Sequence, residues 1–103
     1  MKNSTYHFFF GSLSNSFRVS ILLVLKDGEK SVKELSKELK TEQSKVSHAL
    51  AVLKKCNLVK SRRKGKNVLY SLNKKTVIPL LNLIDKHAKL FCKGCCAFCG
   101  RCA

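Results

Sequence analysis

Acidic side chains are scarce in this chain: six Asp and Glu stand against 21 Lys and Arg, a formal charge of +15 on 103 residues. The stretch from Gln43 to Ile84 holds ten Lys or Arg and no acidic residue. A charge this large and this segregated indicates a polyanion partner, and nucleic acid fits it best. An enzyme has little support, because no acid–base pair or phosphate-binding loop accompanies Cys56 and His48.

Long hydrophobic runs are also missing. Two short apolar runs, Phe8–Phe10 and Val19–Leu25, are separated by polar residues, among them Arg18. A membrane-spanning helix needs ~20 apolar residues, and no small-residue cleavage site of a secretory signal follows. We therefore expect no membrane partner and a cytoplasmic location, where thiols stay reduced and clustered cysteines more often bind metal than form disulfides.

Internal repeats and Gly/Ser linkers are absent as well, and the length suits one domain with one core. An apolar content of 45% predicts a folded protein. We divide the chain into a folded domain, residues 1–91, and a cysteine-rich C-terminal tail, residues 92–103.

The apolar spacing in the first half predicts four helices. The first covers Tyr6–Leu13, and the second is capped by Ser14 or Ser16 and ends at Asp27-Gly28. Ser31 and Glu34 have the spacing of a capping box that begins the third helix. The fourth, capped by Thr41, runs to about Lys55. Its buried stripe is Val46, Ala49, Leu50 and Leu53, and the stripe of the second helix is Phe17, Ile21, Val24 and Leu25.

A basic hairpin follows the fourth helix. Asn57 can take the left-handed conformation that ends a helix, and Leu58–Arg62 and Asn67–Leu72 read as two strands. Gly65 makes the turn of the tip between them. Thr76 is then expected to cap the last helix, with Pro79 in its first turn.

Two helices joined by a tight turn and followed by a basic hairpin predict a winged helix-turn-helix, mainly α with a small β-hairpin wing. The exposed side of the fourth helix is short and polar enough to enter a DNA major groove. The alternatives are a solvated basic face and a non-specific, chromatin-like binder. The candidate DNA contacts are Gln43, Ser44, Lys45, Ser47 and His48 on the helix and Arg62, Arg63, Lys64 and Lys66 on the wing.

The segment Leu13–Leu72 resembles the ArsR/SmtB family of metal-responsive repressors. The resemblance rests on LSNSFRVSIL, VKELSKEL, SKVSHALAVLKKCNLV and RRKGKNVLYSL. It implies a homodimer that dimerises through its first and last helices. It also implies binding to a palindromic, double-stranded DNA operator, and release of that operator when a metal ion or another inducer binds.

Two known metal sites of the family are not reproduced. The third helix reads ELSKELK and lacks the paired cysteines of arsenic and cadmium sensors. On the last helix, Asp85 and His87 match the opening of a second site type. Its downstream ligands would fall at Phe98 and Arg101, which cannot bind metal.

Five of the six cysteines lie in the tail, and we interpret them as a metal or thiol-switching site; the residues are Cys92, Cys95, Cys96, Cys99 and Cys102. Four thiolates would suit zinc, cadmium or an iron–sulfur cluster, and fewer would suit arsenite or copper(I). An oxidant is an alternative effector. The cysteines also share one face of a continued helix, so they could instead form a packing stripe between subunits. Cys56 is expected to be a small core residue.

Overall fold

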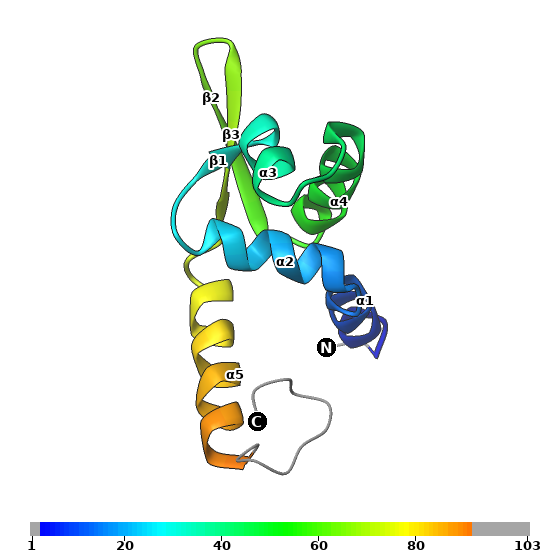
Figure 1. Cartoon of the computed structure of the whole chain (residues 1–103). Coiled ribbons are helices and arrows are strands. Elements are labelled where there is room, and N and C mark those ends of the chain that lie inside the picture. Colours follow the sequence, from blue (N-terminus) through cyan, green and yellow to red (C-terminus); the bar gives the residue numbers. More distant parts are fainter. Residues whose placement is uncertain (1–2, 92–103) are drawn as a thin grey trace. The chain divides into compact units, whose positions relative to one another are not determined.

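The computed structural model describes residues 3–91. The chain divides into two units, Met1–Asn73, which holds the elements from α1 to β3, and Lys74–Ala103, which holds α5. The predicted fold class, a mainly helical winged helix-turn-helix, is confirmed. The elements are α1 (Asn3–Leu13), α2 (Ser16–Leu25), β1 (Lys30–Ser31), α3 (Val32–Glu38), α4 (Gln43–Lys55), β2 (Val59–Lys64), β3 (Asn67–Leu72) and α5 (Val77–Phe91) (Figure 1).

A side-chain cap sets where α2 begins but not where α4 begins, and two predicted caps are wrong. The cap of α2 is Asn15, whose Oδ1 accepts from the backbone N–H groups of Phe17 and Arg18 at 3.0 and 3.1 Å, in place of Ser14 or Ser16. Residue Glu42 occupies the cap position of α4, without a side-chain cap bond, where Thr41 was expected. The Thr41 N–H instead donates to the Ser36 carbonyl, which closes the turn after α3.

The sheet is antiparallel and has three strands in the order β1-β3-β2. The sequence predicted the hairpin but not β1, because a strand of two residues has no readable alternation. Strand β2 extends to Lys64, which pairs with Asn67, so the tip is a two-residue turn. Gly65 has φ +62°, the left-handed conformation that such a turn requires.

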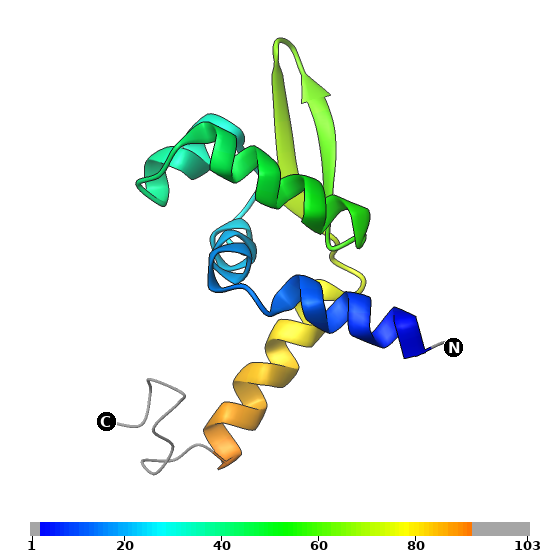
Figure 2. The ribbon, with the colours of Figure 1, turned by 90° about the vertical axis from the view of Figure 1, so that its right-hand side faces the viewer.

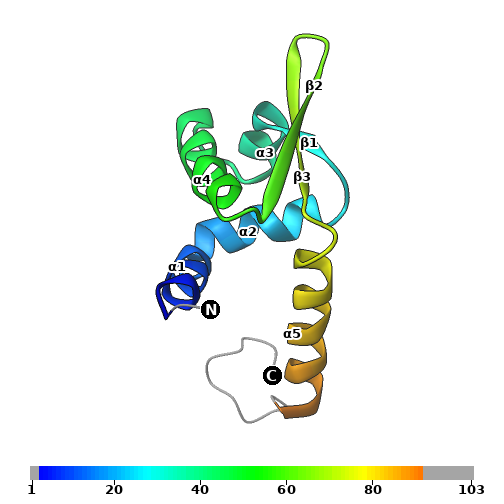
Figure 3. The same ribbon diagram turned by 180° about the vertical axis from the view of Figure 1, so that it is seen from behind.

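The core of the first unit lies between α2, α3, α4 and the base of the sheet. Contacts of α2 with α1, α4 and β3, and of α3 with α4 and β1, hold these elements together. Figures 1 and 3 show the hairpin from its two sides, projecting beyond α3 and α4. The fully or almost fully buried side chains of these elements are Ile21, Leu22, Leu25, Leu35, Val46, Leu50, Leu53, Leu58, Val59 and Leu72.

The helices at the two ends of the described chain carry large apolar side chains in solvent. Tyr6, Phe8 and Phe10 of α1 are exposed, and so are Leu83, Ile84, Leu90 and Phe91 of α5. Among residues 3–91, no single helix is long and apolar enough to cross a membrane. The pair α1 and α2, bent by 79° at its break, passes that test of length and composition only when taken together.

Candidate nucleic-acid interface

Helix α4 has one buried and one exposed face, as its sequence predicted. Val46, Ala49, Leu50 and Leu53 are buried. The predicted DNA contacts all lie on the exposed part of the helix, in its first two turns; they are Gln43, Ser44, Lys45, Ser47 and His48. Short polar side chains at the start of an exposed helix leave room for it to approach base edges in a major groove.

The end of α4 is fixed to the sheet. Asn57 has φ +57°, the predicted left-handed conformation, and the Leu58 N–H donates to the Leu53 carbonyl at 3.0 Å. The ammonium of Lys54 donates to the Ser61 hydroxyl of β2 at 2.8 Å. Helix α4, the recognition helix of the helix-turn-helix, and the wing therefore hold a defined position within this unit. Figure 2 shows α4 along its length beside the hairpin.

The wing presents its basic residues on two different faces. Successive side chains of a strand point to opposite faces. Val59 is buried, and Ser61 meets α4, so Arg63, two residues further on, lies on the same face, toward the helices. Arg62 and Lys64 lie on the other face, opposite Leu69 and Asn67 of β3. The sequence predicted that the wing carries Arg62, Arg63, Lys64 and Lys66, but it could not assign each side chain to a face of the sheet.

A groove of about 560 Å³ joins the wing to the recognition helix. Gln43 from the first turn of α4 and Lys66 from the wing tip both line it, so the structure brings together predicted contacts from the two elements. Its other lining residues, none of which was a predicted DNA contact, are Ser31, Val32, Lys33, Glu34, Asn67 and Val68.

A second hollow lies at the turn between α3 and α4 and is rich in lysine. It is lined by Lys37, Lys40 and Lys45, together with Ser36, Thr41 and Glu42. The Lys45 ammonium lies 4.6 Å from the centroid of the Phe17 ring, a cation–π contact that directs this side chain toward the start of α2. Only Lys45 of these lysines was a predicted contact, because Lys37 and Lys40 precede the recognition helix in the sequence.

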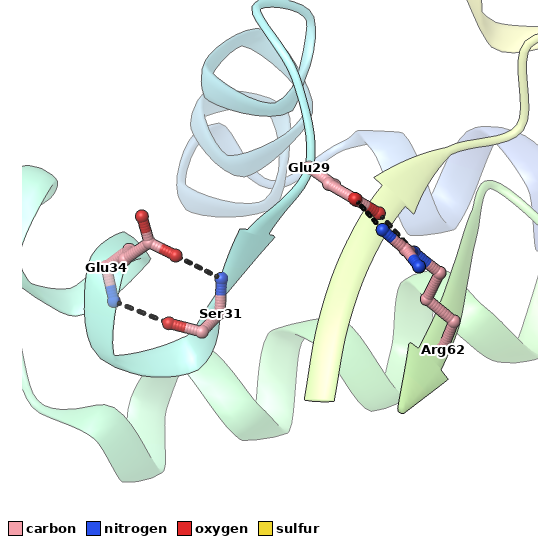
Figure 4. A network of polar contacts seen from close by, with 4 residues as sticks. All are labelled: Glu29, Ser31, Glu34 and Arg62. Atoms are coloured by element: carbon pink, nitrogen blue, oxygen red, sulfur yellow. Dashed lines mark hydrogen bonds and ion pairs between the residues drawn. The ribbon is translucent and has the colours of Figure 1, made fainter. Parts of the chain in front are cut away.

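Arg62 is held by a carboxylate within the same unit. Its Nε donates to Glu29 Oε2 at 2.8 Å, and one terminal nitrogen donates to Glu29 Oε1, so the pair is bidentate (Figure 4). Hydrogen bonding to Glu29, and then its negative charge, raise the pKa of Arg62 above its ordinary value. Glu29 carries no motif and was not singled out from the sequence.

The predicted capping box at the start of α3 is present. The Ser31 hydroxyl accepts from the Glu34 N–H at 3.2 Å, and Glu34 Oε1 accepts from the Ser31 N–H at 3.1 Å (Figure 4). The backbone hydrogen bond from Ser31, with a further one from its side chain and the charge of Lys30, lowers the pKa of Glu34. This cap fixes the point at which β1 ends and the helix-turn-helix begins.

The structure describes only some of the predicted thiol and metal residues. Cys92, Cys95, Cys96, Cys99 and Cys102 lie outside the described residues. Within residues 3–91, no group of three His, Cys, Asp or Glu is arranged to hold a metal ion. His87, of the partial motif with Asp85, packs against Phe91, with ring centroids 5.0 Å apart and the rings tilted by 38°.

Cys56 departs from the expectation of a core position. It is half-buried and follows the last residue of α4 as its C-cap. It lines a cavity of about 450 Å³ with Phe8 and Phe9 of α1, so its surroundings are more open than those of a core residue.

Comparison with known proteins agrees with this geometry. The family model "Bacterial regulatory protein, arsR family" matches residues 15–61. The chain is 35% identical over 83 residues to the transcriptional activator HlyU of Vibrio cholerae, covering 81% of this chain and 74% of that protein. It is 37% identical over 79 residues to the transcriptional repressor SmtB homolog of Synechocystis, covering 77% of this chain and 60% of that protein.

Among solved structures, the homodimeric winged helix-turn-helix DNA-binding domain Mb0332 of Mycobacterium bovis, a possible ArsR-family regulator, is similar with a TM-score of 0.77. The two are 27% identical, and the match covers 84% of this chain and 80% of that one. The chain therefore belongs to the ArsR family, whose members are DNA-binding transcription regulators and not enzymes, and for which homodimers are typical.

Proposed function

We propose that this protein is a cytoplasmic, homodimeric repressor that binds a palindromic operator through α4 and the wing. The observation that carries the proposal is the groove shared by Gln43 of α4 and Lys66 of the wing, since a winged helix reads DNA with these two elements together. Within the groove a phosphate backbone would meet Lys66 and Lys33, while the exposed start of α4 lies beside it.

The roles divide between base reading and backbone binding. Gln43, Ser44, Ser47 and His48 are proposed to face base edges, because amide, hydroxyl and imidazole groups can distinguish base pairs. Lys45, Arg63, Lys64 and Lys66 are proposed to neutralise phosphates, which sets affinity and register but carries no sequence information. Each phosphate contact adds about 0.9 to the slope of log affinity against log salt concentration.

The effector is proposed to act at the C-terminal cysteines. Lys86, Lys89, Lys93 and Arg101 are close to them in the sequence, and nearby positive charge favours the thiolate form. Thiolates would bind zinc, cadmium, arsenite, copper(I) or an iron–sulfur cluster, or would react with an oxidant. Support for this site comes from the donor chemistry of the sequence alone.

A change at the tail can reach DNA through the dimer. The two half-sites of an operator lie about one DNA turn, ~34 Å, apart. A small rotation of the two subunits relative to each other therefore moves their α4 helices out of register with the two half-sites. A coupling free energy of about 1–3 kcal/mol is enough for a useful switch.

The test is operator footprinting and titration of the full chain with and without Zn²⁺, arsenite or peroxide. The variant in which Cys92, Cys95, Cys96, Cys99 and Cys102 are all serine is compared with Cys56→Ser as the matched control. We expect a discrete footprint on the operator. One effector should weaken it in the wild type and in Cys56→Ser, but not in the variant with five serine substitutions.

Two outcomes would contradict different parts of the proposal. Equal protection of random and palindromic DNA would favour a non-specific basic binder. A specific footprint that no effector changes would remove the sensor and leave the regulator. Elemental analysis of anaerobically purified protein identifies a tail-bound metal independently, because the fivefold serine variant would lose it.

A further inference from the structure

The wing is joined to the start of the helix-turn-helix by a very short junction. Strand β1 is two residues long and pairs with β3 only through Lys30–Tyr70 and Ser31–Leu69. Helix α3 begins at the next residue, Val32. The wing is therefore held to the end of α4 on one side, and on the other side it is joined to the start of α3 only through a junction with few backbone hydrogen bonds.

The pair Glu29–Arg62 crosses this junction. In the strand order β1-β3-β2, β1 and β2 are not neighbours. Glu29 immediately precedes β1, and Arg62 is on β2, where it pairs with Leu69; Leu69 in turn pairs with Ser31 of β1. The bidentate pair thus spans the central strand and ties the two outer strands together, on the sheet face away from α4 (Figure 4).

We propose that Glu29 and Arg62 form a clamp that positions the wing, and that Arg62 acts through this clamp and does not contact DNA. The inference rests on the proposed DNA-binding function and refines it. Nε and one terminal nitrogen of Arg62 are engaged by one carboxylate, which is the bidentate geometry in which a planar guanidinium fork matches a carboxylate. Of the two neighbouring arginines, Arg63, on the face toward α4, is the one left available to phosphate.

The charge-swapped variant Glu29→Arg/Arg62→Glu separates positioning from contact. It keeps the net charge and restores the clamp with its ends exchanged, but it puts a carboxylate where a DNA-contacting Arg62 would meet phosphate. We expect operator affinity within about twofold of wild type and an unchanged salt slope, because no phosphate contact is lost. The single variants Glu29→Gln and Arg62→Gln should each weaken operator binding up to about fivefold, the upper range for an exposed ion pair.

A second measurement examines the clamp without DNA. Amide hydrogen exchange at Tyr70 and Leu69 should be up to about fivefold faster in Glu29→Gln and Arg62→Gln, and restored in the swap. The matched control is Lys30→Glu/Glu38→Lys, which exchanges another ion pair of this unit, Lys30 Nζ to Glu38 Oε2 at 3.5 Å. We expect this control to leave operator affinity unchanged.

Three results would overturn the clamp. Loss of operator binding in the swap, with a slope for the dimer lower by about 1.8, would make Arg62 a phosphate contact in each subunit. Weak binding in the swap with an unchanged slope would show that the exchanged pair does not position the wing. Exchange rates that neither single variant alters would show that the pair does not hold the junction. A wild-type chain that binds no operator would instead refute the proposed function, and the exchange rates would still decide the clamp.

Discussion

Arg62 and Arg63 are neighbours in the sequence, yet they have different surroundings. Arg62 is engaged by Glu29 on the outer face of the wing, while Arg63 shares the face of Ser61, which meets Lys54 of α4. Composition and motif placed both at the wing and could not separate them. The strand register separates them, because adjacent side chains alternate between faces.

This difference predicts the salt dependence of operator binding for Arg63. Replacing Arg63 with Gln should lower the log–log salt slope of dimer binding by about 1.8, since each of the two subunits loses one phosphate contact worth about 0.9. The matched control is Lys60→Gln, which removes the same charge from the exposed outer face, and its slope should equal that of wild type. Anisotropy titrations across a range of salt concentrations measure both slopes. Equal reductions in the two variants would indicate a general charge effect without a specific contact at Arg63.

Glu34 predicts a pH-dependent contribution to stability. Hydrogen bonds from Ser31 lower its pKa from the ordinary 4.5, so the folded protein favours the charged form. The contribution is fully present above about pH 4.5 and is lost as the pH falls through the lowered folded-state pKa. Wild type should therefore exceed Glu34→Gln in unfolding free energy at pH 7, with the gap shrinking toward pH 3. Urea denaturation at several pH values measures this gap. A gap that stays constant with pH would contradict a role for the charge.

The residues whose roles were predicted correctly from the sequence are those whose conformation depends on their near neighbours in the chain. Ser31 and Glu34 form the predicted box, and Asn57 and Gly65 adopt the predicted left-handed conformations. Glu29 could not be predicted, because its partner is 33 residues away and the contact depends on strand order. Asn15 was missed for a smaller reason: several residues in a row were able to cap α2, and propensity alone does not rank them.

At the scale of elements, the wing depends on the turn at Gly65. No atom lies within 4 Å of where its Cβ would be, so a side chain there meets no steric obstacle and only the positive φ penalises it. We expect Gly65→Ala to lower the unfolding free energy by about 1 kcal/mol, the cost of a left-handed L-residue. Urea denaturation measures the loss, and operator titration should show weaker binding as the tip shifts.

The matched control for Gly65→Ala is Gly11→Ala. Gly11 lies within α1, is equally open and has no positive φ. Alanine is favoured over glycine inside a helix by up to about 1 kcal/mol, so this variant should be as stable as wild type or more stable. Similar losses in both variants would mean that the turn conformation is not what Gly65 contributes.

The short elements were the hardest to predict. The positions of α3, α4 and the hairpin follow from apolar spacing and turn residues, and the buried stripe of α4 is the one predicted. Strand β1 has no periodicity of its own and exists because Lys30 and Ser31 pair with Tyr70 and Leu69. The groove beside Gln43 likewise requires two elements to be brought together in space, which a linear pattern does not report.

At the scale of the whole molecule, α5 carries an apolar stripe suited to a partner subunit. The exposed residues Leu83, Ile84, Leu90 and Phe91 recur at helical spacing, and His87 between them packs against Phe91. Large apolar groups in solvent mark association surfaces when they are contiguous. Because homodimers are typical of the family, we propose that this stripe contributes to the dimer contact.

Introducing a carboxylate into that stripe tests the proposal. Leu90→Glu should shift the sedimentation profile from dimer to monomer and weaken operator binding about tenfold or more, since a monomer loses the gain of binding two half-sites together. Affinity for an isolated half-site should change little, because α4 and the wing belong to the other unit. The matched control is Asn82→Glu, which adds the same charge at an exposed polar position of α5. If Leu90→Glu stays dimeric while Asn82→Glu dissociates, the dimer contact lies on a different face of the helix.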